Sequence, residues 1–109
     1  MQEIQKLKSY SVDVFSDHRG GGQSPWVRIG EFERLEEAVE ACKRVVDDFL
    51  KSHINLFMGP DRLVNAFLNY GDVPAINGAE NLKTFDVYEY LVRRCVEITS
   101  PRSYKTVFS

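Results

Sequence analysis

The sequence predicts a single α+β domain, residues 1–109, in which a small antiparallel sheet packs against about three helices in the order β-β-α-α-(β)-α. Two kinds of pattern lead to this prediction. Residues 9–16 and 26–32 are rich in β-branched and aromatic residues, and a glycine-rich connector joins them into a hairpin. Three later stretches repeat apolar residues at steps of three and four, the period of amphipathic helices.

The first expected strand has two different faces, as a half-buried strand should. Tyr10, Val12 and Val14 point one way, and the other face carries Ser11, Asp13 and Phe15. Phe15 is the one apolar residue on the face that is expected to be exposed to solvent. This strand should therefore cover the core with its valine face.

The second expected strand changes face part-way along its length. Val27 and Ile29 share one face, whereas Phe32 lies on the other, and Gly30 stands where the phase changes. A β-bulge at Gly30, or the close approach of a helix there, would reconcile the two halves.

The clearest element is a long helix that begins at Leu35. Its apolar residues are Leu35, Ala38, Val39, Cys42, Val45, Val46, Phe49 and Leu50. Its other face is charged, and the pairs Glu40 with Arg44 and Asp47 with Lys51 have the i to i+4 spacing of helix ion pairs. We interpret this charge run as a solvated face rather than a partner surface.

Two shorter helices and a weak strand complete the expected fold. Gly59-Pro60 and Gly71 bound a helix with the stripe Leu63, Val64, Phe67 and Leu68. Residues 73–76 are expected to form a short edge strand. Thr84 is the expected N-cap of a last helix, which ends at Thr99 before Pro101 and has the stripe Tyr88, Leu91, Val92, Cys95 and Ile98.

The chain ends are expected to lie at the periphery. Residues 1–8 and 100–109 should be flexible or peripheral, although the segment 103–108 is rich in β-formers and could add a strand to an open sheet edge.

The connector "DHRGGGQSPW" holds most of the candidate site residues. Its glycines lead into a strand rather than a helix and lack phosphate-loop spacing, which favours a hairpin connector over a nucleotide cradle. His18, Arg19 and Trp26, with Phe15 and Arg28 of the flanking strands, form a candidate binding patch, because exposed Trp and Arg often anchor protein partners. Alternatively, Trp26 pairs with Phe15 across the strands and simply closes the hairpin.

Composition narrows the function classes. The net charge is −2 and the pI about 5.7, which argues against nucleic-acid binding through bulk charge. No apolar run is long enough to span a membrane, and the first residues lack a signal-peptide core, which favours a cytoplasmic protein. Cys42 and Cys95 are expected to be buried free thiols. No catalytic motif, metal site or cofactor site is predicted.

The favoured function is a small cytoplasmic binding or protein-interaction domain, with an unknown protein partner or self-association through open sheet edges. The alternative is a small-molecule-binding protein or an enzyme whose cleft lies near the loops 17–25 and 71–80. In that cleft Asp17, His18, Arg19 and Asp72 would supply the polar groups.

Four stretches together resemble a family of small uncharacterised bacterial proteins: "YSVDVFSD", "IGEFERLEEAVEACKRVVDDFL", "NYGDVPAI" and "FDVYEYLVRRCVEI". That family reads Y-x-V-x-V, then G-E-F-x-T-x-E-E-A-x-x-A-C-x-x-I-V-D, then a phrase such as F-G-E-D-P-F-I and an aromatic-led helix with a cysteine. The resemblance implies no activity or catalytic residue. Arg34 replaces the family's hydroxyl residue at the helix entrance, and the connector is glycine-rich where the family's is acidic.

Overall fold

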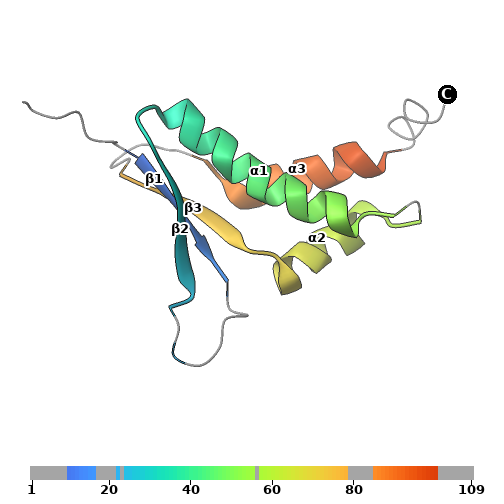
Figure 1. Ribbon diagram of the computed structural model, residues 1–109. Coiled ribbons are helices and arrows are strands. Elements are labelled where there is room, and N and C mark those ends of the chain that lie inside the picture. The colour runs from blue at the N-terminus through green and yellow to red at the C-terminus, as the bar shows by residue number, and fades with distance from the viewer. Residues whose placement is uncertain (1–9, 17–21, 23, 56, 79–84, 101–109) are drawn as a thin grey trace, which may run out of the picture.

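The computed structural model describes residues 10–16, 22, 24–55, 57–78 and 85–100, and it confirms the α+β fold (Figure 1). The elements in chain order are β1 (Tyr10–Phe15), β2 (Trp26–Phe32), α1 (Leu35–His53), α2 (Pro60–Tyr70), β3 (Val73–Asn77) and α3 (Val87–Thr99). The predicted order β-β-α-α-β-α is therefore correct, and the weak strand near residue 75 is present.

The three strands form an antiparallel sheet in the order β2-β1-β3, so that β1 is the central strand. Asp13 of β1 lies opposite Arg28 of β2 on one side and Ala75 of β3 on the other. All three helices lie on one side of the sheet (Figure 1). Pro74 is tolerated in β3 because, among the described strands, β3 pairs only with β1, so the missing N–H of Pro74 interrupts no pairing on the outer edge.

A β-bulge interrupts the pairing of β1 with β2, as the phase change in the second strand predicted. Val12 lies opposite Gly30, whereas the next residue, Asp13, lies opposite Arg28, which leaves Ile29 as the extra residue. A side chain at Gly30 would meet the ring of Phe32 at 2.7 Å. The glycine at this point lets that ring fold back over the strand.

The core lies between the sheet and the helices and consists of two clusters. The smaller one joins β1 to the first half of α1 and contains Val12, Ala38, Ala41 and Cys42. The larger one holds the three helices together and contains Val46, Leu50, Leu63, Phe67, Val87, Leu91 and Cys95. Because α1 contributes to both clusters, this helix links the sheet to the α2–α3 pair.

The apolar stripes predicted for the two shorter helices are partly wrong. In α3 the core-facing line begins at Val87, which is buried, whereas Tyr88 and Val92 are about half exposed. In α2 Leu63 and Phe67 are buried but Leu68 is exposed. Both helices have apolar arcs wider than one contact face, and periodicity alone does not show which part of such an arc meets the core.

The helix ends also differ in part from expectation. The N-cap of α3 is Asp86, whose carboxylate accepts hydrogen bonds from the backbone N–H groups of Tyr88 and Glu89. Thr84, the predicted cap, lies outside the described residues. Arg34 makes no side-chain cap for α1, as its lack of a short hydroxyl predicted.

Both predicted i to i+4 ion pairs of α1 are wrong. Within the described chain Glu40 pairs with Lys43, at 3.8 Å, and Asp47 pairs with Arg94 of α3, at 3.2 Å. Asp47 turns toward α3 because a neighbouring helix offers it stronger hydrogen-bond donors than the exposed ammonium of Lys51 does.

Residues 1–8 and 103–108, which were expected to be peripheral or to add a strand, lie outside the described residues. Of the helices in the described part of the chain, none combines the length and the apolar character needed to cross a bilayer.

Candidate functional site

The sheet face that the helices leave uncovered carries a polar network at its centre. Asp13 lies on the central strand, and its carboxylate accepts hydrogen bonds from Arg28 Nε, at 2.9 Å, and from Asn77 Nδ2. Arg28 also reaches Glu31 at 3.4 Å. The Arg28 guanidinium holds the pKa of Asp13 below its usual value. This network ties both outer strands to β1.

An aromatic pair follows the network toward the connector end of the sheet. Phe15 lies opposite Trp26, their ring centroids are 5.1 Å apart and the rings are tilted by 59°. A hydrogen bond from the backbone N–H of Ser16 to the carbonyl of Pro25, at 2.8 Å, closes the hairpin beside this pair. The predicted cross-strand pair is thus present, yet Trp26 remains 48% exposed.

An apolar pocket of about 400 Å³ opens beside this pair. Its lining comes from the sheet and from two helices, and consists of Phe15, Trp26, Leu68, Gly71, Val73 and Tyr88. Leu68 lies in the last turn of α2 and Tyr88 in the first turn of α3, and both are about half exposed. The Tyr88 hydroxyl and the Trp26 indole N–H are the polar side-chain groups of this lining. A pocket with this mostly apolar lining can hold an apolar side chain.

The charges closest in sequence to the pocket lining are acidic. Asp72 stands between the lining residues Gly71 and Val73, is exposed, and forms no ion pair with any residue the structure describes. Asp86 adds a second exposed carboxylate two residues before Tyr88. Of the described arginines, the one closest in sequence to a lining residue is Arg28, which is already engaged by Asp13 and Glu31. Among the described residues the lining is therefore apolar, and its charged sequence neighbours are mostly acidic.

The structure locates two of the five predicted site residues at this pocket. Trp26 lines it and Asp72 adjoins it, whereas Asp17, His18 and Arg19 lie outside the described residues. The sequence reading missed Leu68 and Tyr88, because it placed both on core-facing stripes. The width of the apolar arcs on the two helices was the available signal for their exposure.

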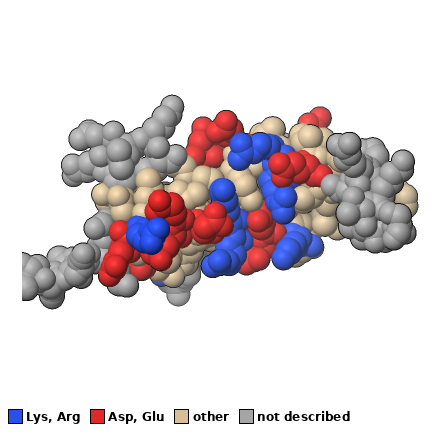
Figure 2. Space-filling model, turned by 90° about the horizontal axis from the view of Figure 1, so that it is seen from above, with Lys and Arg blue, Asp and Glu red and all other residues tan. Residues whose placement is uncertain are grey.

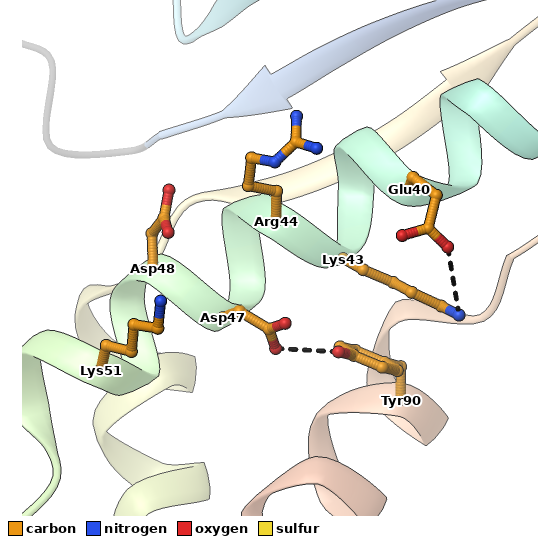
Figure 3. A pocket seen from close by; sticks show the side chains of 7 residues that line it. All are labelled: Glu40, Lys43, Arg44, Asp47, Asp48, Lys51 and Tyr90. Atoms are coloured by element: carbon orange, nitrogen blue, oxygen red, sulfur yellow. Dashed lines mark hydrogen bonds and ion pairs between the residues drawn. The ribbon is translucent and has the colours of Figure 1, made fainter.

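A second, charged cleft lies between α1 and α3 (Figure 3). It is lined by Glu40, Lys43, Arg44, Asp47, Asp48, Lys51 and Tyr90. In Figure 3 Lys43 and Asp47 extend toward Tyr90, whereas Arg44 and Asp48 point away from it. Figure 2, seen from the helical side, shows basic and acidic side chains interspersed over the middle of this face. A surface of such mixed sign does not favour one charge in a ligand.

Tyr90 is the centre of the charged cleft. Its hydroxyl donates to Asp47 Oδ1 at 2.8 Å, and the same oxygen accepts from Arg94 Nε at 3.2 Å. Lys43 lies over the Tyr90 ring at 5.5 Å. Burial, helped by the Asp47 carboxylate, raises the pKa of Tyr90 to about 12. A phenol with this pKa stays neutral near pH 7 and acts as a donor that joins two helices.

The two cysteines and His53 pack against other residues of the fold and do not line either pocket. Cys42 and Cys95 are buried free thiols, as predicted, and burial raises the pKa of each to about 11. His53 stacks on Phe49 at the end of α1, with ring centroids 3.8 Å apart. Among the described residues no group of three or more His, Cys, Asp or Glu side chains could hold a metal ion.

Comparison with known proteins finds no matching family model, no matching curated protein and no matching solved structure. The resemblance to small bacterial proteins therefore stays a prediction.

Proposed function

We propose that this protein is a protein-interaction domain that takes an apolar side chain of a basic partner segment into the pocket beside Trp26. The pocket carries the proposal, because it gathers half-exposed aromatic and aliphatic side chains from β2, α2 and α3 around an open cavity. Exposed apolar groups of this kind are usually retained for binding. The cytoplasmic location predicted from sequence belongs to the same proposal, and the free thiols of Cys42 and Cys95 support it.

The basic character of the partner follows from charge. Asp72 and Asp86 put unneutralised carboxylates close to the lining, and the whole chain has a net charge of −2. A partner segment with Lys or Arg beside its apolar anchor gains favourable interactions with these groups, whereas an acidic segment is repelled. The same balance makes a nucleic-acid backbone an unfavourable partner.

Trp26 makes the proposal directly measurable, because it is the sole tryptophan of the chain. Short synthetic peptides without aromatic residues are titrated while its emission is recorded. A central Leu flanked by Lys should shift the emission to shorter wavelength, and the same peptide with a central Ser should not. Flanking the Leu with Glu should weaken the effect. The proposal fails if no Leu peptide shifts the emission, or if the Ser peptide shifts it equally.

A pair of substitutions tests the location of binding. Leu68→Ser removes a half-exposed lining side chain and should weaken binding by about tenfold, equivalent to about 1.4 kcal/mol. Phe57→Ser removes an even more exposed apolar side chain that does not line the pocket, and it should leave binding unchanged. Equal effects of the two substitutions would show that the peptide binds elsewhere.

The pocket's position favours one second candidate, a small-molecule site. It lies beside the Phe15–Trp26 pair and next to Gly71, and a volume of about 400 Å³ accommodates a fragment-sized ligand. Indole, titrated against the Leu68→Ser and Phe57→Ser variants while its own proton resonances are followed by NMR, separates the two candidates. Saturable indole binding that Leu68→Ser abolishes, together with no binding of any peptide, would replace the proposed function by this one.

A further inference from the structure

The outer side of α3 carries an apolar stripe that the described elements leave about half exposed. Tyr88, Val92 and Val96 are exposed by 50%, 51% and 52%. Successive residues of an α-helix are rotated by about 100°, so a spacing of four places these three side chains in one line along the helix. The core-facing line of the same helix, Val87, Leu91 and Cys95, is a separate one. We call the three exposed residues the α3 stripe.

We propose that the α3 stripe is a self-association surface, on which two copies of this chain pack their α3 helices antiparallel about a two-fold axis at Val92. Such an arrangement is isologous, since each copy presents the same stripe to the other. In this register residues equally far from Val92 in opposite directions face each other. Tyr88 then packs against Val96 of the second copy, a large side chain against a small one, at both ends of the contact.

The charges beside the stripe identify the second copy as its occupant. Glu89 and Arg93 lie on the same flank of α3, and neither forms an ion pair with any other residue in the described part of the chain. With a rise of about 1.5 Å per residue, Arg93 lies about 3 Å along the axis from Glu89 of the second copy. The two-fold axis forms this pair twice. The Arg93 guanidinium lies over the Tyr90 ring at 5.9 Å but has no ionic partner among the described residues. A partner with a plain apolar surface would offer neither Glu89 nor Arg93 an opposite charge.

The sheet edges offer a poorer surface for self-association. The free edge of β2 contains the bulge at Ile29 and the charged residues Arg28 and Glu31, which are features that oppose pairing with another strand. The outer edge of β3 contains Pro74, which lacks the backbone N–H that pairing with another strand would use. The described surface thus favours α3 over either edge.

The test is the molar mass of the full chain in solution, measured by sedimentation velocity over a dilution series. We expect a reversible dimer. Val92→Glu, which puts like charges together on the two-fold axis, should give a monomer with an unchanged circular dichroism spectrum. Ile29→Glu is the matched control, because Ile29 has nearly the same exposure, 47%, on the β2 edge. A chain that is monomeric throughout the series, or a dimer broken by Ile29→Glu but not by Val92→Glu, overturns the proposal.

Charge exchange tests the register without altering the apolar contact. Glu89→Arg or Arg93→Glu alone should raise the dimer dissociation constant by about tenfold, because each change converts two symmetric attractions into repulsions. The double variant, with both residues exchanged, should restore the original value. Arg44→Glu makes the same charge change on α1 and should have no effect. A double variant as weak as the single ones overturns the antiparallel register. Tyr88 also lines the pocket beside Trp26, so the peptide titrations are repeated on the Val92→Glu monomer. Each proposal can then fail without the other.

Discussion

Arg28 Nε lies 2.9 Å from Asp13 Oδ1, across the β1–β2 strand pair and immediately beside the bulge. This contact keeps a carboxylate ionised on a sheet face that is otherwise open, and only 16% of the Asp13 side chain is exposed. Since Asn77 of β3 bonds to the same carboxylate, one side chain connects all three strands.

Acid should weaken the fold through Asp13. Its pKa is lowered in the folded state, so its stabilisation is present above the unfolded value of 3.8 and is lost as pH falls through the folded value. Asp13→Asn should lower the free energy of unfolding at neutral pH by about 1 kcal/mol and flatten its decline below about pH 4. Urea denaturation at several pH values measures both effects. Glu31→Gln is the control. An equal loss of unfolding free energy in this variant would contradict the conclusion that Asp13 is the residue through which acid weakens the fold.

The hydrogen bond from Tyr90 to Asp47 should be visible as an alkaline transition. Tyr90→Phe should lower the free energy of unfolding by about 1 kcal/mol near neutral pH, because the Asp47 carboxylate loses this hydrogen-bond donor. The folded pKa of Tyr90, about 12, exceeds the unfolded value of 10.0, so the stabilisation is complete below pH 10 and lost as pH rises toward 12. The difference in free energy of unfolding between Tyr90→Phe and the parent protein should shrink between pH 10 and pH 12. Tyr88→Phe removes a hydroxyl with no described hydrogen bond and should change little.

The two thiols should react only when the chain unfolds. Cys42 and Cys95 are buried, and their pKa values of about 11 leave almost no thiolate at pH 8. Iodoacetamide labelling, followed by mass spectrometry, should be slow in native buffer and fast in guanidinium chloride. Fast labelling of either cysteine under native conditions would show that the core cluster around that cysteine opens locally.

Gly71 should resist substitution for reasons of packing. A Cβ at this position would lie 2.6 Å from the buried ring of Phe67, whereas a Cβ at Gly59 would meet no atom within 4 Å. Gly71→Ala should destabilise the fold by about 1–3 kcal/mol, because the ring has to move within a packed core. Gly59→Ala should cost only about 0.5 kcal/mol, through loss of a favoured N-cap. Thermal melting of both variants gives the comparison, and equal melting temperatures would contradict it.

The sequence specified the strands, the helices and the bulge well, because each depends on a local pattern. The Gly30 phase change and the Phe15–Trp26 pair could be read from residues close along the chain. The exposure of Leu68 and Tyr88 could not, since it depends on how α2 and α3 rotate against α1. The choice of Asp47 between Lys51 and Arg94 likewise depends on a helix more than forty residues away. The pocket combines residues from both kinds of position, which is why the sequence singled out Trp26 and the neighbouring Asp72 but not Leu68 and Tyr88.

The strand order β2-β1-β3 also has a kinetic consequence. The hairpin of β1 and β2 closes a short loop, but Asp13 and Asn77 are 64 residues apart in sequence. The loop-closure entropy of this second pairing has to be overcome before the sheet gains its third strand, so β3 should dock late, after α1 and α2 have shortened the effective separation. Pulse-labelling hydrogen exchange during refolding should therefore protect the amides of α1 before those of β3. A nascent chain on the ribosome would carry one unpaired edge of its central strand until residue 77 emerged.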